Sequence, residues 1–549
     1  MKKTYRLVAL ALTLLMALSC IGSAAVADAD LPAVDLVYWI GGDGPQADSA
    51  EVNDAVNALI AEVLPNTTVE WVNIPFSEYY EKWSKALAGQ EHMDLCWTGW
   101  MIRIEDEVLS GALLPLDDYA EYAPDLFTSL KESVIDVHRS SDGKLYQFPA
   151  WQGMVGSRSW FGVPEVKWAY LDDGDAWLAE LQTQMYTNWD QTPADKTAVY
   201  DLVEKYLETL SENDALSYGY PATANDLGAW YMPKGTDRMG NSHGFVIFGD
   251  DTFTVQAWAG SDYDRTNAKY MAEWFTKGYI RQDIASLEQQ YIVPDWRGTP
   301  DPNDTYVTNG HNAFTDKSLA KELSGMTFPI KAVFTNPYTI FTPGQSTGTS
   351  LPYTTRNPER AMMFMNLLVT DAGRGVYNTY AFGIEGKHYE WLTPDAENTA
   401  EYLGLTSEEA LDLLGENFIR TFGGNGQSAS TWDYGARPWT LGSLKFAYSC
   451  LAYPQPYYAD LIAAEETAYV VPVSNFKFNP APVESEAMNI QAVSDEYGAM
   501  FGRGYLGVDA WEAKYDEYLD KLNAAGMEIY IAEMQKQLNE FVERTGAKW

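Results

Sequence analysis

The chain has 549 residues, a formal net charge of -40 and an aromatic content of 14%, including 19 Trp and 36 Tyr. A surface this acidic repels phosphate backbones and anionic lipid headgroups, which argues against nucleic acid or a membrane surface as a partner. A chain of this length is too long for one hydrophobic core, so we expect two or more lobes.

Residues 1–27 have the composition of an export signal. Three basic residues among the first six precede an apolar stretch at 7–18, which is too short to cross a bilayer. Ala25-Val26-Ala27 forms an A-x-A cleavage site, whereas the sequence before Cys20 resembles the lipid-attachment site of bacterial lipoproteins. The sequence therefore predicts export, with either lipidation of Cys20 or cleavage after Ala27.

Cysteine and histidine usage argue against disulfides and metal sites. Beyond the signal region the chain has two cysteines, Cys96 and Cys450, each beside apolar residues. We expect both thiols to pack in the core, since they behave as small hydrophobic groups. The five histidines lack the spacing of metal ligands on a helix or hairpin, so no zinc site is expected.

The N-terminal third alternates between strand and helix patterns. Apolar runs rich in β-branched and aromatic residues predict strands at 34–40, 69–74 and 93–98. Between them, residues 48–63 and 77–88 carry apolar side chains at helical spacing. Strand–helix–strand–helix–strand segments of these lengths predict an α/β fold with a parallel, doubly wound sheet and right-handed crossovers.

Aromatic and acidic residues stand at the ends of two of these strands. Trp39 and Asp43 lie at the end of the first strand, and Trp97 and Trp100 lie at the end of the third. In doubly wound sheets, ligands bind beyond the carboxyl ends of the strands. Aromatic planes stack on the apolar C–H faces of sugar rings, and carboxylates accept hydrogen bonds from sugar hydroxyls. These residue types therefore favour a carbohydrate ligand at this edge.

The rest of the chain has fewer clear periodicities and no internal repeat. Helical patterns occur at 196–210 and 266–275, and Pro358 at a first helical position predicts a further helix. Two more helices are expected near the C-terminus, at 509–523 and 527–545. These segments extend the α/β pattern of the first third.

No segment carries a recognisable catalytic motif. Neither G-x-S-x-G nor H-E-x-x-H occurs, and the acidic run at 172–175 lacks the spacing of a calcium loop. We therefore expect a binding protein that is not an enzyme and needs no cofactor or metal. An extracellular glycan-active hydrolase is the alternative, because it shares the acidic and aromatic composition. A cell-surface adhesion module is a third class, and the absence of β-sandwich repeats argues against it.

Several segments occur in the order in which one protein family has them. The segment GIEGKHYE at 383–390 is the most distinctive, and FKFNPAPV at 476–483 accompanies it. The other matching segments lie at 39–48, 80–95, 111–118, 142–149, 355–361 and 533–538. Together they resemble the family 1 extracellular solute-binding proteins of ABC importers, carbohydrate type, and most of all the LipO-like subgroup.

The resemblance implies a two-lobed, periplasmic-binding-protein-like fold of type II, with a ligand cleft between the lobes. The chain would first cross between lobes near Pro149, which places Trp151 and Gln152 beside the cleft as further ligand contacts. The implied N-terminal lobe comprises 28–150 and a return segment at 331–385. The implied C-terminal lobe comprises 151–330 and 386–549.

The resemblance also implies partners. The ligand would be a sugar or an oligosaccharide, bound by closure of the lobes about a hinge. The closed form would then dock on the transmembrane permease subunits of the importer. A monomer is expected, with membrane contact only through a lipid on Cys20.

Overall fold

The computed structural model describes most of the chain after the signal region. The described residues are 31–151, 156–190, 197–216, 236–237, 243–247, 249–286, 308–313, 316, 319, 329–335, 337, 340–341, 347–396, 399, 403–422, 432, 438–473 and 476–549. Cys20, Ala27 and Gln152 lie outside them. Within these ranges, no helix is both long enough and apolar enough to cross a membrane.

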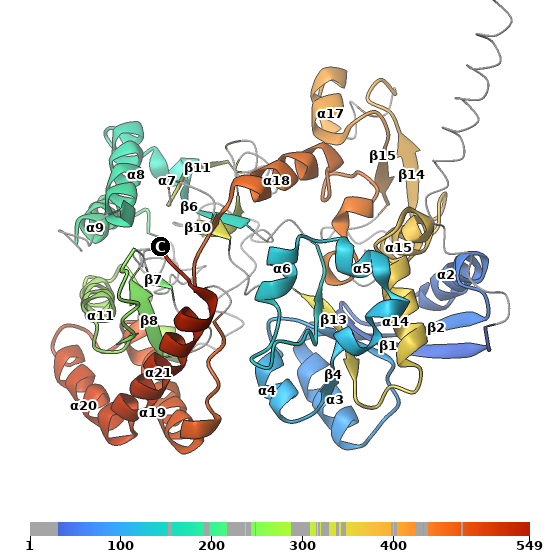
Figure 1. Ribbon diagram of the computed structural model, residues 1–549. Coiled ribbons are helices and arrows are strands. Elements are labelled where there is room, and N and C mark those ends of the chain that lie inside the picture. Colours follow the sequence, from blue (N-terminus) through green and yellow to red (C-terminus); the bar gives the residue numbers. More distant parts are fainter. Residues whose placement is uncertain are drawn as a thin grey trace, which may run out of the picture.

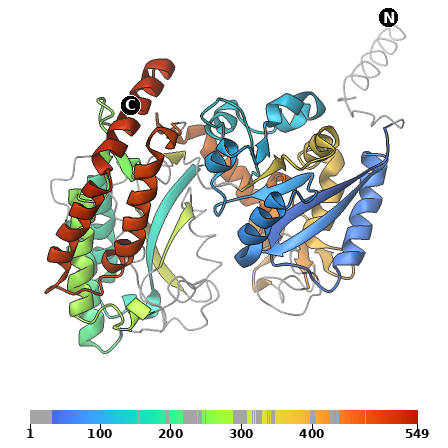
Figure 2. The ribbon, with the colours of Figure 1, turned by 90° about the horizontal axis from the view of Figure 1, so that it is seen from below.

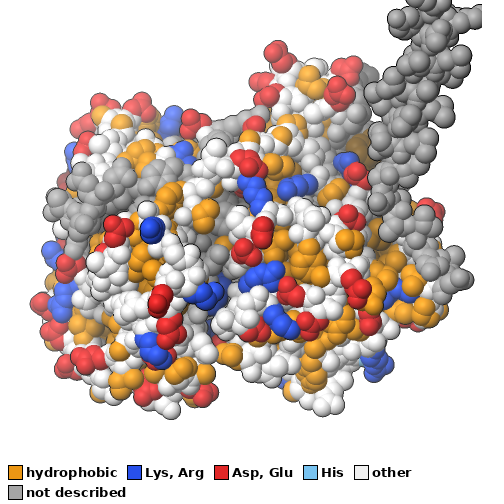
Figure 3. All heavy atoms as spheres, viewed as in Figure 1, with side chains coloured by type: hydrophobic (Ala, Val, Ile, Leu, Met, Phe, Trp, Pro, Cys, Tyr) orange, Lys and Arg blue, Asp and Glu red, His pale blue; other side chains and the backbone are white. Residues whose placement is uncertain are grey.

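The described residues form two lobes, which lie side by side in two perpendicular views (Figures 1 and 2). In the space-filling view a seam separates the lobes, and charged side chains of both signs lie along it (Figure 3). The expected α/β architecture with two lobes is thus confirmed.

The first lobe is built on a six-stranded sheet of order β2-β1-β3-β13-β4, with β5 paired to β13. Its strands are β1 (Val34–Gly42), β2 (Thr67–Pro75), β3 (Leu95–Thr98), β4 (Leu113–Leu114), β5 (Phe148–Pro149) and β13 (Gly348–Pro352). β1 pairs in parallel with both β2 and β3, as the strand–helix alternation predicted. β13 runs antiparallel to β3, β4 and β5, and it joins the sheet from far along the sequence.

Helices cover this sheet because their apolar side chains lie on one face. In α2, Val52, Val56 and Ile60 are fully buried, while the charged residues between them face outward. The first-lobe helices are α2 (Ser49–Val63), α3 (Phe76–Ala88), α4 (Ile104–Leu109), α5 (Pro124–Thr128), α6 (Glu132–Val137), α14 (Pro358–Leu367), α15 (Arg374–Phe382), α17 (Ser407–Leu414) and α18 (Gln455–Thr467). Cys96 and Cys450 are both buried in this core, as expected.

The first lobe extends further along the chain than the expected boundary at 386. The hairpin of β14 (Tyr389–Leu392) and β15 (Phe418–Thr421) contributes Tyr389 and Ile419 to the first-lobe core. Leu461 of α18 joins the same core. These apolar faces are covered by α15 and its neighbours, so the chain returns to the second lobe after α18 rather than near 386.

The second lobe combines a sheet with helices. The sheet has the order β10-β6-β12-β16, with β11 also paired to β6. Its strands are β6 (Gly156–Pro164), β10 (Thr308–Ala313), β11 (Ile330–Phe334), β12 (Ile340–Phe341) and β16 (Tyr469–Val470), and a smaller sheet has β7 (Thr236–Asp237), β8 (Gly244–Ile247) and β9 (Gln256–Ala257). The helices are α7 (Glu165–Trp168), α8 (Gly174–Asp190), α9 (Ala198–Glu212), α11 (Asp262–Thr276), α19 (Glu484–Gly502), α20 (Trp511–Ala524) and α21 (Met527–Thr545). The helices predicted at 196–210, 266–275, 509–523 and 527–545 correspond to α9, α11, α20 and α21.

The chain crosses between the lobes three times. It leaves the first lobe after β5, returns between β12 and β13, and leaves again after α18. The second crossing was expected near 330, but β11 pairs with β6 there and keeps that segment in the second lobe. β12 pairs with both β6 and β16, so the three crossings reach the second lobe side by side.

Candidate ligand-binding site

Three aromatic side chains gather where the parallel strands of the first lobe end. Phe76 follows β2, Trp100 follows β3, and Trp439 comes from the 3-10 turn Pro438–Thr440. The ring centroids are 5.0 Å apart for Phe76 and Trp100 and 5.8 Å apart for Trp100 and Trp439. Phe76 and Trp439 stack at 5.8 Å with an interplanar angle of 16°. We call Phe76, Trp100 and Trp439 the aromatic platform.

The platform is open to solvent chiefly at Trp100. The side chain of Trp100 is 58% exposed, whereas an indole of this size is usually buried in a protein interior. Phe76 and Trp439 are partly buried against the first-lobe core. An exposed Trp held in place by two other rings presents a rigid apolar surface to a ligand.

Trp97 supports the platform from below. It is fully buried and makes an edge-to-face contact with Trp100 at 5.2 Å. A side chain at Gly41 or Gly99 would collide with the Trp97 ring, since the added carbon would lie 2.7 and 2.2 Å from it. These two glycines therefore make the room that the indole occupies. The Tyr79 hydroxyl donates to the Trp97 carbonyl at 2.8 Å and fixes the end of β3.

The two candidates from the first strand lie at the same edge of the sheet. Trp39 belongs to β1, and its side chain is partly buried against the first-lobe core. Asp43 follows the last residue of β1 and is exposed. The loop after β1 is held by an ion pair of 3.0 Å between Asp48 and Lys387. The edge thus offers an exposed carboxylate in addition to the aromatic platform.

Trp151 is enclosed where the first crossing begins. Its side chain is 1% exposed, and its indole Nε1–H donates to Glu465 at 3.2 Å. Its backbone N–H donates to the Gly442 carbonyl, and its own carbonyl accepts from Leu444. Of the predicted site residues, Trp100 and Asp43 are exposed and Trp39 is partly covered, whereas Trp97 and Trp151 are buried.

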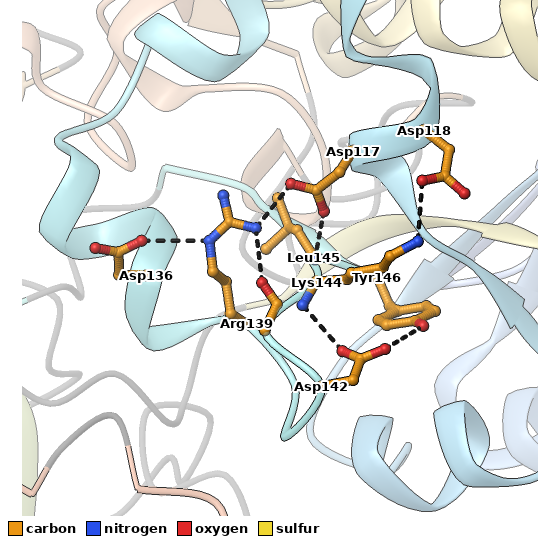
Figure 4. Close-up of polar contacts among 9 residues, drawn as sticks. Asp117, Asp118, Asp136, Arg139, Asp142, Lys144, Leu145 and Tyr146 are labelled. Carbon is orange, nitrogen blue, oxygen red and sulfur yellow. Dashed lines mark hydrogen bonds and ion pairs between the residues drawn. The ribbon is translucent and has the colours of Figure 1, made fainter. Parts of the chain in front are cut away.

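A polar network fixes the chain just before the first crossing (Figure 4). The Arg139 guanidinium donates to Asp117 at 2.8 Å, and the other oxygen of that carboxylate accepts from the Leu145 N–H at 2.7 Å. The Tyr146 hydroxyl donates to Asp142 at 2.8 Å. The buried Gln147 amide then donates to the Thr98 carbonyl, which ties β5 to β3. The crossing therefore starts from a fixed position beside the platform.

The described ranges contain no group of three or more His, Cys, Asp or Glu side chains placed to hold a metal ion. Burial lowers the pKa of His138 to about 4, and burial raises the pKa of the Glu107 carboxyl above its ordinary value. The ring Nδ1–H of His138 donates to the Val134 carbonyl at 2.7 Å. The platform itself is made of rings that do not ionise and whose faces are electron-rich, so it suits an uncharged apolar surface better than an anion.

The same fold occurs in known structures. The N-glycan transport solute binding protein (NgtS) from Streptococcus pneumoniae, crystallised in complex with Man1GlcNAc, is 18% identical over 93% of this chain and 99% of that chain, with a TM-score of 0.65. An extracellular solute-binding protein from Bifidobacterium longum subsp. infantis is 14% identical over 92% of this chain and 98% of that chain, with a TM-score of 0.55. This protein has the two-lobed solute-binding-protein fold.

Sequence comparisons add less. The family described as a domain of unknown function (DUF3502) matches residues 472–543, which include α19, α20 and most of α21. No curated protein sequence matches the chain. The solute-binding-protein fold is therefore shown by structural similarity, and its ligand must be argued from the site.

Two platform residues were absent from the sequence prediction. Phe76 directly follows β2. Ligands bind beyond the carboxyl ends of the strands, and this rule was applied to the first and third strands only. Applied to the second strand as well, it identifies Phe76. Trp439 lies in a short turn more than 300 residues further along the chain. No local pattern marks it, because its position depends on how the segment 438–446 packs against the first crossing.

Proposed function

We propose that this protein is the extracellular substrate-binding protein of an ABC importer and that it captures a neutral sugar or oligosaccharide between its lobes. The observation that carries the proposal is the exposed aromatic platform at the carboxyl ends of the parallel strands, in a two-lobed fold. The similar fold of NgtS, a glycan-transport protein crystallised with Man1GlcNAc, supports the same ligand class.

Five residues have a direct role in this proposal. Trp100, backed by Phe76 and Trp439, stacks on the C–H face of a sugar ring. Asp43 accepts hydrogen bonds from sugar hydroxyls at the same edge, and Gln152 supplies an amide from the first crossing. Stacking on an aromatic ring contributes about 0.5–1.5 kcal/mol beyond the area that it buries. The lack of ionisable groups in the platform favours a neutral ring over an acidic one.

Closure of the lobes completes the binding site. The three crossings connect the core of the first lobe to the two separate cores of the second, so the second lobe can turn against the first about a few residues in each crossing. Closure over the platform excludes water from the stacked ring and strengthens hydrogen bonds to its hydroxyls. The permease subunits of the importer then recognise the closed form and receive the sugar.

Export places the protein where such a ligand is found. Residues 1–27 act as the export signal, and the protein is either held at the cell surface by a lipid on Cys20 or released by cleavage after Ala27. Within this proposal the protein is a monomer, and it belongs to the LipO-like subgroup of the family 1 solute-binding proteins.

Calorimetric titration against a panel of neutral oligosaccharides tests the proposal. We expect at least one glycan to bind with a dissociation constant in the micromolar range or below, which corresponds to about -8 kcal/mol. Chromatography of the same mixture should recover the glycan unchanged after prolonged incubation. Absence of binding across the panel would contradict the proposed ligand class, and release of cleaved products would favour the hydrolase alternative.

A further inference from the structure

Trp151 and Glu465 join two crossings that are far apart in the sequence. Trp151 stands at the start of the first crossing, and Glu465 lies in the last turn of α18, just before the third. The indole Nε1–H of Trp151 donates to Glu465 Oε2 at 3.2 Å. We call this hydrogen bond the Trp151–Glu465 bridge.

The bridge is enclosed by residues of the first lobe. Tyr458, two turns before Glu465 on the same face of α18, packs edge-to-face on Trp151 at 5.5 Å. The Lys445 ammonium lies 4.7 Å from the centre of the Trp151 ring, in cation–π geometry. The backbone of Trp151 is paired to the segment around Ser443 by an isolated β-bridge. Two segments of the first lobe, α18 and the segment around Ser443 and Lys445, therefore hold one indole ring in a single orientation.

A carboxylate at this position is energetically unfavourable. Its second oxygen, Glu465 Oε1, is buried and has no hydrogen-bond partner among the described residues. Burial raises the pKa of the Glu465 carboxyl, and burial also lowers the pKa of Lys445 beside it. An apolar side chain at this position would stabilise the fold more by packing, because a buried charged group is seldom a net source of stability. The carboxylate instead fixes the direction of α18 relative to the indole N–H.

Beyond the bridge the chain enters the second lobe at once. α18 ends at Thr467, and Ala468 is extended, with φ -64° and ψ 137°. Tyr469 is then already in β16 and pairs with Ile340 of the second-lobe sheet. The bridge therefore belongs to the first lobe and lies at its border with the second lobe.

We propose that the Trp151–Glu465 bridge holds the starts of the first and third crossings together as one unit of the first lobe, so that the second lobe turns only about residues beyond Trp151 and Thr467. In this arrangement Trp151 and Glu465 are positioning residues that set the angle between the lobes. Trp151 then acts on a ligand indirectly and does not contact it. The inference concerns the protein without ligand, so it holds or fails independently of the proposed function.

Pulsed electron–electron spin resonance measures the angle between the lobes as a distance. Spin labels are placed at Lys82→Cys in α3 and Lys536→Cys in α21, two exposed helix positions, in a protein carrying Cys20→Ser. Cys96 and Cys450 are buried and are not expected to react. We expect Trp151→Phe, which keeps a ring but removes the N–H, and Glu465→Ala each to broaden the distance distribution and shift its mean by several ångströms.

Three further variants make the test specific. Glu465→Gln retains a carbonyl acceptor for the Trp151 N–H, and we expect its distance distribution to match that of the wild type. Glu466→Ala removes a neighbouring exposed ion pair with Lys131 and should leave the distribution unchanged. The double variant Trp151→Phe/Glu465→Ala should be no broader than the single variants, because both remove the same bond. Wild-type distributions in both single variants, or a broadening that adds up in the double variant, would overturn the proposal. If Trp151→Phe does not fold, Glu465→Ala and Glu465→Gln decide the matter between them.

Discussion

Replacing Trp100 by alanine should weaken ligand binding far more than it weakens the fold. The indole is 58% exposed, and its contacts are with Phe76, Trp97 and Trp439 at 5.0–5.8 Å. Loss of a stacked ring removes about 0.5–1.5 kcal/mol of aromatic interaction in addition to the apolar area that the sugar covers. Affinity should therefore fall about tenfold or more, since 1.4 kcal/mol corresponds to a factor of ten. Because more than half of the ring faces water, the unfolding free energy should fall by about 1 kcal/mol or less.

Calorimetry with the best-binding glycan and thermal melting without ligand measure these two effects. Trp391→Ala is a matched control, because Trp391 is also an exposed first-lobe tryptophan, at 41%, and lies outside the platform. Trp100→Phe should recover part of the affinity by restoring a ring. Wild-type affinity in Trp100→Ala would refute the assignment of the platform as the ligand surface. An equal loss of affinity in Trp391→Ala would also refute it.

Four other predictions concern burial, charge and lobe closure. Trp97→Ala and Trp151→Ala should each cost about 3–5 kcal/mol in urea unfolding, because both rings are almost fully enclosed; a stability equal to wild type would show that the rings do not pack as described. Burial alone would raise the pKa of Asp94, but hydrogen bonds from backbone amides outweigh burial and lower that pKa. The stabilisation from Asp94 should therefore be lost as the pH falls through its folded-state pKa. In Asp94→Asn, stability should depend less on pH in this acid range. Burial lowers the pKa of His138 from 6.5 to about 4, so between these pH values the unfolded chain binds a proton that the native state does not. The free energy of unfolding should therefore fall by up to about 3 kcal/mol as the pH drops from 6.5 to 4. The same pH dependence of stability in a variant lacking His138 would exclude this cause. Saturating glycan should reduce the radius of gyration in small-angle scattering, whereas an unchanged radius would count against lobe closure.

Local patterns were sufficient to predict the helices and the parallel part of the first sheet. α2 is defined by apolar residues at helical spacing, and β1 and β2 by short apolar runs, so neighbouring residues alone determine them. β13 is different, because its partner strands lie about 200–250 residues away in the sequence. The sequence of the β14–β15 hairpin likewise predicts an apolar face, but it does not indicate whether that face packs on the first lobe or the second.

The candidate site was predicted in part for the same reason. Strand ends can be located in the sequence, and this places Trp97 and Trp100 at one edge of the sheet. Which of them is exposed depends on Gly41 and Gly99, whose missing side chains let Trp97 turn inward. Trp151 stands at the start of a crossing, but its ring is enclosed by α18, which no local pattern could indicate. Long-range packing therefore separates the supporting indoles from the exposed one.

A crystal structure of the protein with the glycan that binds most tightly tests the central claim most directly. We expect a sugar ring stacked on Trp100, with the second lobe closed over it and the glycan intact. The same structure should show Trp151 against Glu465, out of contact with the ligand. A glycan bound away from the platform, with Trp100 open to solvent, would contradict the account.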